Sequence, residues 1–318
     1  MVSHRKILRR LLNQDLNRKD PEPPPLPELS TAPDIQSGRL CFVTGLHRSG
    51  TSIVHRRLRA HPDVSGFADT GVPEDEGQFL QSIFKPAWHH GGPGKFAFDP
   101  AANLTEQDAA ALSEDQRDRL LRQWGYHWDL SRSILVEKSP PSLVRARFLQ
   151  HLFPDCRFIF LVRHPVAVSL ATEKWSKSTL CELLVHWAAA HARFLADVNK
   201  IRNYLIIRYE DLCRAPEQVQ SAICRLLGLE TVAAEEPLAD HNQKYFGGWE
   251  GHDARPWILE NVAITGALSH VAHCFGYDLT APYVRPPKDD RVFHPHAQTQ
   301  QPPLDPMAED HGDAAGAA

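Results

Sequence analysis

Residues 45–52 read G-L-H-R-S-G-T-S and follow an apolar run at 40–44. Gly45 and Gly50 have the spacing of a phosphate-binding loop that joins a strand to a helix. Such a loop surrounds an anion with backbone N–H groups, and the positive end of the helix adds to the attraction. A nucleotide triphosphatase has lysine at the position of Thr51, so the usual cation for a magnesium-bound triphosphate is missing here.

Other side chains of the loop replace that lysine. Arg48 supplies a planar cation with several donors, which suits a tetrahedral oxyanion. A Gly/Ser turn that only caps an ordinary helix is the alternative interpretation, but the strand before the loop and the helix after it favour binding. We therefore predict an anion-binding loop that uses Gly45, Arg48, Ser49, Gly50, Thr51 and Ser52.

This loop resembles the 5′-phosphosulfate loop of the sulfotransferases that use 3′-phosphoadenylyl sulfate (PAPS). A second segment, R-F-I-F-L-V-R-H-P-V-A-V-S-L-A-T at 157–172, is similar to the 3′-phosphate element of that family, an arginine after a strand and a serine on the next helix. Arg163 and Ser169 match these residue types, although they lie closer together than in the family. The resemblance implies that both residues bind the 3′-phosphate.

Two further segments follow in the family's order. R-Y-E-D-L at 208–212 resembles a Y-E-D-L segment, which implies that Tyr209 contacts the nucleotide and that Glu210 and Asp211 are structural. F-G-Y-D at 275–278 resembles a closing segment of the same enzymes. The match is nearest to the protein-tyrosine, carbohydrate and bacterial branches.

Sulfuryl transfer needs a base for the acceptor hydroxyl and cations for the charge on the transferred group. For the cations, Arg48 comes first, and Lys138 in L-V-E-K-S-P-P resembles a lysine of the tyrosine sulfotransferases; a solvated lysine is the alternative. For the base, Asp69 falls on the position of a catalytic glutamate in those enzymes. The alternatives are Glu74, Asp75, Glu76 and, by analogy with the cytosolic branch, His89 or His90.

Alternating apolar and helical patterns predict an α/β fold with a central parallel sheet flanked by helices in a P-loop-like topology. The segment 66–130 is less regular and is expected to cover the carboxyl ends of the strands, where such folds bind ligands. Strands are predicted at 39–44, 133–137, 157–162 and 203–208, and helices at 50–60, 141–153, 165–175, 178–200, 215–228 and 256–275.

We predict a basic and then proline-rich lead-in at 1–37, a sulfotransferase domain at 38–284 and a disordered tail at 285–318. The net charge of −4 argues against a nucleic-acid partner. No apolar stretch approaches the roughly 20 residues of a membrane span. The six scattered cysteines have no metal-ligand spacing and suggest a reducing compartment. Because we find no signal peptide, we expect a cytoplasmic enzyme.

The resemblance implies a sulfotransferase that moves a sulfuryl group in line from PAPS to a hydroxyl or similar nucleophile and needs no metal. Adenosine 3′,5′-bisphosphate is the second product, and the acceptor is a small molecule, a lipid or a saccharide. A P-loop nucleotide kinase or phosphotransferase, or a non-catalytic nucleotide-binding relative, are the alternatives. Trp88, Phe246 and Trp249 are candidate walls of the acceptor pocket, with core packing as the other role for each.

Overall fold

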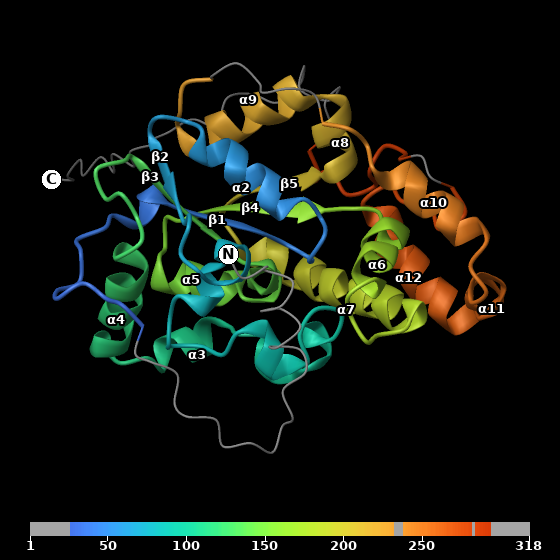
Figure 1. Ribbon diagram of the computed structural model, residues 1–318, viewed down its shortest axis with the longest axis horizontal. Helices are drawn as coiled ribbons and strands as arrows, with labels where there is room; N and C mark the ends of the chain where they lie inside the picture. The colour runs from blue at the N-terminus through green and yellow to red at the C-terminus, as the bar shows by residue number, and fades with distance from the viewer. Residues whose placement is uncertain (1–25, 232–237, 282–283, 294–318) are drawn as a thin grey trace, which may run out of the picture.

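Five parallel strands form the central sheet of the computed structural model, which describes residues 26–231, 238–281 and 284–293. Their order is β2-β3-β1-β4-β5, so the first strand of the chain lies in the middle (Figure 1). The predicted α/β fold with a central parallel sheet is confirmed. The strands are β1 (Leu40–Gly45), β2 (Val64–Gly66), β3 (Ile134–Lys138), β4 (Arg157–Val162) and β5 (Asn203–Arg208).

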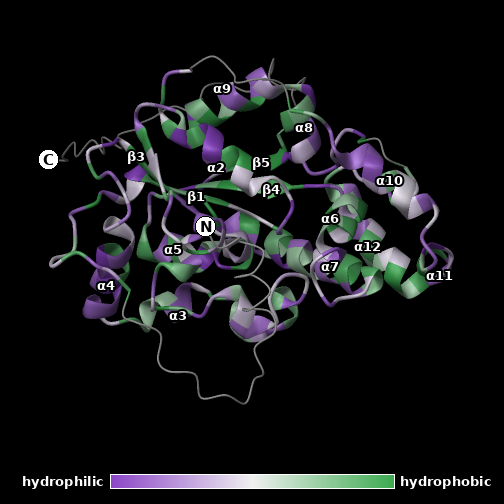
Figure 2. Ribbon diagram, viewed as in Figure 1, coloured by the Kyte–Doolittle hydropathy of each residue, from purple (hydrophilic) through white to green (hydrophobic). Residues whose placement is uncertain are grey.

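Alternate residues of each strand face two separate hydrophobic layers. In β1, Cys41 and Val43 belong to one layer, whereas Leu40 and Phe42 belong to the other. Figure 2 shows the strands as mainly apolar, as expected for a parallel sheet that is covered on both faces, and charged residues such as Glu137 and Lys138 lie at the strand ends. The first layer contains α2 (Thr51–Arg59), α8 (Tyr209–Arg214) and α9 (Pro216–Leu227); the second contains α5 (Ala146–Leu152), α6 (Pro165–Glu173), α7 (Leu180–Asp197) and α12 (Val262–Cys274).

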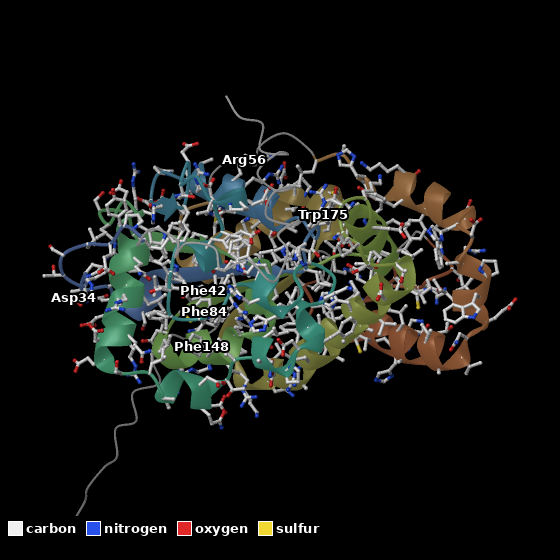
Figure 3. The ribbon with its side chains drawn as sticks, turned by 60° about the horizontal axis from the view of Figure 1, so that its bottom comes forward. Asp34, Phe42, Arg56, Phe84, Phe148 and Trp175 are labelled. Carbon is white, nitrogen blue, oxygen red and sulfur yellow. The ribbon has the colours of Figure 1, made fainter. Side chains whose placement is uncertain are left out.

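Aromatic rings fill the second layer beside the irregular segment 66–130. The ring of Phe42 lies 5.4 Å from that of Phe158 and 6.0 Å from that of Trp124. Phe84 meets Phe148 at 5.6 Å (Figure 3). The segment therefore has its own anchors in the core, and it contains short 3-10 turns together with α3 (Glu106–Ala110) and α4 (Glu114–Gly125).

Several predicted elements differ in their limits. The helix expected at 141–153 is a 3-10 turn, η7 (Pro140–Val144), followed by α5. The helix expected at 256–275 is divided into α11 (Arg255–Glu260) and α12, because the Asn261 side chain accepts from the backbone N–H of Ile264 at 3.2 Å and caps a new helix. The short strand β2 and the glycine-containing α10 (Asn242–Glu250) were not predicted.

Both predicted domain limits are crossed by packed residues. Near the start, the backbone N–H of Leu29 donates to the Arg122 carbonyl at 3.1 Å. Near the end, the Phe293 N–H donates to the Ile206 carbonyl at 2.9 Å, and Val292 is buried, so the packed chain extends beyond 284. The basic part of the predicted lead-in and the rest of the predicted tail lie outside the described residues. Within the described ranges, no helix has the length and apolar composition of a membrane span.

Candidate active site

The predicted anion-binding loop lies at the carboxyl end of β1. Gly45 has φ 149°, and a Cβ on it would lie 2.2 Å from the Leu161 carbonyl oxygen. Gly50 has φ 101° at the N-cap of α2, and a Cβ there would lie 3.0 Å from the Tyr209 ring. Both positions therefore require glycine. Thr51 begins α2, whose first backbone N–H groups have no partners within the helix and can bind an anion.

The loop side chains divide into buried and exposed groups. Ser49 is completely buried, and its Oγ has no hydrogen-bond partner among the described residues. Arg48 is exposed and has φ 71°, while the exposed Ser52 donates from Oγ to Glu74 Oε2 at 3.2 Å. A buried hydroxyl without a partner is costly, and an anion bound in the loop would supply that partner.

Arg163 follows β4 and lies against the loop. Its Nη1 donates to the Arg48 carbonyl oxygen at 2.9 Å, and its guanidinium lies 4.0 Å from the centroid of the Tyr209 ring. The side chain is buried, yet Nη2 has no partner in the part of the chain that the structure describes. The structure thus brings the predicted residues Arg163 and Tyr209 together beside the loop, with one donor of the cation unused.

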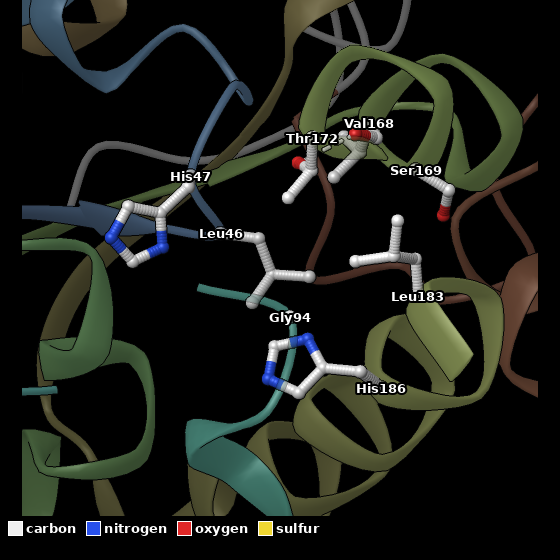
Figure 4. A pocket seen from close by; sticks show the side chains of 8 residues that line it. All are labelled: Leu46, His47, Gly94, Val168, Ser169, Thr172, Leu183 and His186. Carbon is white, nitrogen blue, oxygen red and sulfur yellow. Dashed lines mark hydrogen bonds between the residues drawn. The ribbon is translucent and has the colours of Figure 1, made fainter. Parts of the chain in front are cut away.

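Ser169 makes no hydrogen bond with Arg163 or Tyr209 in the described part of the chain. It is buried on α6 and its Oγ has no partner among the described residues. It lines a small cavity of about 10 Å³ (Figure 4). The other described residues that line this cavity are Leu46, His47, Gly94, Val168, Thr172, Leu183 and His186, and Arg163 is not among them. The cavity connects the loop with α6 and α7 rather than with Arg163.

A larger cavity of about 260 Å³ opens beside the loop, at Arg48, Thr51 and Ser52. Its aromatic wall includes Trp88, which is 46% exposed and lies 4.8 Å from the ring of Phe79. Residues of 73–93 form most of the remaining wall, as expected for the segment predicted to cover the strand ends. The full lining is His47, Arg48, Thr51, Ser52, Pro73, Glu74, Glu76, Gln78, Phe79, Ala87, Trp88, Pro93, Pro140 and Trp175.

Of the three aromatic residues predicted to form walls of the acceptor pocket, the structure places only one at the cavity. Trp88 lines the cavity, but Phe246 and Trp249 are core residues: Phe246 lies 4.6 Å from the His164 ring, and Trp249 Nε1 donates to the Leu279 carbonyl. Sequence reasoning missed Phe79 and Trp175. Trp175 follows the end of α6, a helix length away from the end of β4, so no signal in the sequence placed it at the cavity.

The candidate bases are distributed unequally around this cavity. Glu74 and Glu76 line it, whereas Asp69 is exposed, has φ 52° and is not among the described lining residues. Burial raises the pKa of Asp75, but hydrogen bonds from Thr70 outweigh that effect and leave the pKa below its usual value. The two histidines lie elsewhere: the pKa of exposed His89 is lowered by desolvation, and His90 Nδ1 lies 2.6 Å from Asp99 Oδ2.

Lys138 is not among the described lining residues, but it contacts two residues that are, Glu74 and Glu76. It is 0% exposed, and its Nζ donates to the Glu74 carbonyl oxygen at 2.7 Å and to Glu76 Oε1 at 3.3 Å. Gln78 donates to the other oxygen of Glu76. Burial raises the pKa of Glu76, although Lys138 opposes this rise. Glu76 is therefore a carboxylate that is held in place by hydrogen bonds, lines the cavity and has a raised pKa.

Comparison with known proteins identifies the family. The model of the sulfotransferase family matches residues 41–233, more than half of the chain. The chain belongs to the sulfotransferase family. This match includes the loop, Lys138, Arg163 and Tyr209.

Individual relatives of this sulfotransferase are distant. It is 26% identical over 280 residues to protein-tyrosine sulfotransferase 2 of Gallus gallus. The aligned region covers 78% of this chain and 71% of the Gallus gallus protein. It is 27% identical to the nodulation protein NoeE of Sinorhizobium fredii, covering 59% of this chain and only 49% of NoeE. The sulfotransferase domain of the Synechococcus PCC 7002 olefin synthase has 20% identity and a TM-score of 0.46, covering 78% of this chain and 98% of that domain.

Among the residues with described positions, no cluster of three or more His, Cys, Asp or Glu side chains has an arrangement that could hold a metal ion.

Proposed function

We propose that this sulfotransferase takes its sulfuryl group from PAPS and transfers it to a hydroxyl or similar nucleophile. The observation that carries the proposal is a pair of buried donors without partners, Ser49 Oγ in the loop and Arg163 Nη2 beside it. Two such donors fit a ligand with two separate anionic groups. The loop would hold the 5′-phosphosulfate, Arg163 would hold the 3′-phosphate, and Tyr209 would contact the nucleotide. Ser169 stays a predicted contact of the 3′-phosphate.

The cavity beside the loop is the proposed place of reaction. Arg48 is its exposed cation and would stabilise charge on the transferred group. The acceptor oxygen would form a bond to sulfur as the bond from sulfur to the 5′-phosphate breaks, leaving adenosine 3′,5′-bisphosphate. Of the acids considered, Glu76 is best supported as the base that receives the acceptor proton, because it lines the cavity and Lys138 and Gln78 fix it.

The walls of this cavity suggest an acceptor with an apolar face. Phe79, Trp88 and Trp175 line it together with three prolines. We propose a small molecule, a lipid or a saccharide that carries a hydroxyl, without a nucleic-acid partner. A cytoplasmic location is part of the proposal, because the six cysteines are scattered along the sequence without metal-ligand spacing, which fits a reducing compartment.

Calorimetric binding of adenosine 3′,5′-bisphosphate, compared with ATP and Mg²⁺, tests the donor. We expect the bisphosphate to bind and the metal-bound triphosphate to bind much more weakly, because the loop lacks the lysine of a nucleotide triphosphatase. Binding of ATP and Mg²⁺ alone would favour a kinase or other phosphotransferase. No affinity for the bisphosphate would contradict the proposal.

Transfer of labelled sulfuryl from PAPS to a panel of hydroxyl acceptors tests the chemistry. The Arg48→Ala variant is the control, and we expect it to lose about 10²–10³-fold in rate, as removal of one transition-state donor does elsewhere. A protein that binds the bisphosphate but transfers nothing to any acceptor would be a non-catalytic relative.

A further inference from the structure

A neutral amide separates the site cation Arg163 from a buried carboxylate. Arg163 Nε donates to Asn242 Oδ1 at 2.8 Å, and Asn242 Nδ2 donates to Glu210 Oε1 at 2.6 Å. The three residues are 6%, 2% and 2% exposed, respectively. Only the oxygen of the amide can accept from Arg163 and only its nitrogen can donate to Glu210, so the two neighbours fix its orientation.

Glu210, at the end of this series of hydrogen bonds, accepts two further hydrogen bonds. Glu210 Oε1 also accepts from the backbone N–H of His164 at 3.1 Å, and Oε2 accepts from the Tyr277 hydroxyl at 2.8 Å. Tyr277 belongs to the segment at 275–278 near the end of the described chain, and His164 is the residue directly after Arg163. Glu210 thus links α8, the end of β4 and the C-terminal segment to α10 through Asn242.

The interposed amide has a consequence for the charge of Arg163. A carboxylate in direct contact would form a bidentate pair with the guanidinium, occupy two of its donors and neutralise it. Asn242 occupies Nε alone, while Nη1 is bound to the Arg48 carbonyl and one face of the group lies on Tyr209. The donor Nη2 is left without a partner among the described residues, although it is buried.

We propose that Asn242 is a positioning residue that fixes the Arg163 guanidinium while leaving its charge and Nη2 available for the 3′-phosphate of the donor. Glu210 acts through Asn242 by holding the amide in place. This inference rests on the proposed function, since it assumes that the nucleotide has a 3′-phosphate and that Arg163 binds it.

The Asn242→Leu variant tests the role, because leucine has a similar size and makes neither hydrogen bond. Adenosine 3′,5′-bisphosphate and adenosine 5′-phosphate are the two probes, since they differ in the 3′-phosphate alone. We expect the affinity for the bisphosphate to fall by about tenfold to a hundredfold, the range of a lost charge-assisted contact. The affinity for the 5′-phosphate should stay within about threefold of the wild-type value.

Gln243→Leu is the matched control, because Gln243 is exposed and adjacent on the same helix. It should bind both probes as the wild-type protein does. If the leucine at 242 prevents folding, as shown by a lost thermal transition, Asn242→Asp provides the test. It keeps the acceptor for Arg163 Nε, but its carboxylate would pair with the guanidinium, so the affinity for the bisphosphate should fall about tenfold while the affinity for the 5′-phosphate stays within about threefold of the wild-type value.

The outcomes separate the two proposals. If the wild-type protein does not bind the bisphosphate, or binds it no more tightly than the 5′-phosphate, the assignment of the donor and of Arg163 fails. A second outcome is that the wild type prefers the bisphosphate while the variants at 242 lose the same affinity for both probes, or lose no affinity for either. In that case the positioning role of Asn242 fails and the assignment of the donor survives.

Discussion

Lys138 Nζ lies 3.3 Å from Glu76 Oε1, and both side chains are buried where the cavity meets the end of β3. Desolvation favours the neutral form of Glu76, while the lysine favours its carboxylate. The balance produces a carboxylate whose pKa is raised and which still has a counter-ion. A general base for an acceptor hydroxyl requires this combination of a raised pKa and a fixed position.

Glu76→Gln therefore tests the base. The amide keeps the shape of the side chain but does not take a proton at neutral pH, so we expect the transfer rate to fall by about 10²–10⁴-fold, the usual contribution of a general base. Bisphosphate affinity should change little, because the described hydrogen bonds of the Glu76 side chain go to Gln78 and Lys138 and not to Arg163 or Ser49. The measurement is the initial rate of labelled transfer to an acceptor identified from the panel.

Asp69→Asn is the matched comparison for this prediction, since it makes the same chemical change at the exposed acid. We expect it to retain most of the activity. A large loss with Asp69→Asn and a small one with Glu76→Gln would return the role to Asp69, as the resemblance implies.

Lys138→Met is expected to destabilise the protein. Removal of one partner of a buried ion pair leaves the other charge without compensation and typically costs about 3–5 kcal/mol in the free energy of unfolding. The pKa of Glu76 should rise further, because Lys138 lowers it in the wild-type protein. Urea unfolding of Lys138→Met and of the double variant Lys138→Met/Glu76→Gln measures this effect. The double variant should recover part of the loss, and no recovery would show that the pairing with Glu76 is unimportant.

The close approach of Gly50 to Tyr209 gives a steric prediction. Gly50→Ala places a Cβ 3.0 Å from the Tyr209 ring and imposes φ 101° on an alanine. Gly71→Ala provides the control, because Gly71 has φ 83° but nothing lies within 4 Å of its Cβ position. Both variants should lose about 1 kcal/mol or more of stability through backbone strain. Bisphosphate affinity should fall only for Gly50→Ala, and an equal effect of the two would mean that the ring contact is irrelevant to the loop.

The parts of the site that lie next to strand ends were predictable from the sequence. Gly45, Arg163 and Tyr209 each follow a short apolar run, and the carboxyl ends of parallel strands meet at one edge of the sheet. The base and the support of Arg163 were harder to predict because they depend on the path of irregular chain. Glu76 and Asp69 have the same chemistry in the sequence, and only the turns of 66–80 decide that Glu76 is the one beside the cavity.

The role of Asn242 could not be predicted from the sequence for a different reason. It lies in a helix with two consecutive glycines, which weakens any helical pattern, and it reaches Arg163 across 79 positions of sequence. The strand β2 was missed since its three residues give too short a pattern for a strand prediction. Long-range packing determined both elements, and local residue preferences did not indicate them.

Glu137 is the buried neighbour of Lys138 in β3. Burial raises the pKa of this carboxyl to about 7 from its usual 4.5, and the nearby Glu76 also raises it, against the opposing hydrogen bond from Ser139. The folded protein therefore binds this proton more tightly than the unfolded chain. The associated stability is fully present below pH 4.5 and is lost as the pH rises through about 7.

Glu137→Gln should remove this dependence, because the amide does not titrate. Relative to the wild type, its free energy of unfolding should increase as the pH rises from 4.5 to about 7. The change across this window should be at most roughly 3–4 kcal/mol, since a pKa shift of one unit corresponds to about 1.4 kcal/mol. Urea unfolding at a series of pH values measures the difference. Parallel curves for the two proteins throughout the window would show that Glu137 has an ordinary pKa in the folded state.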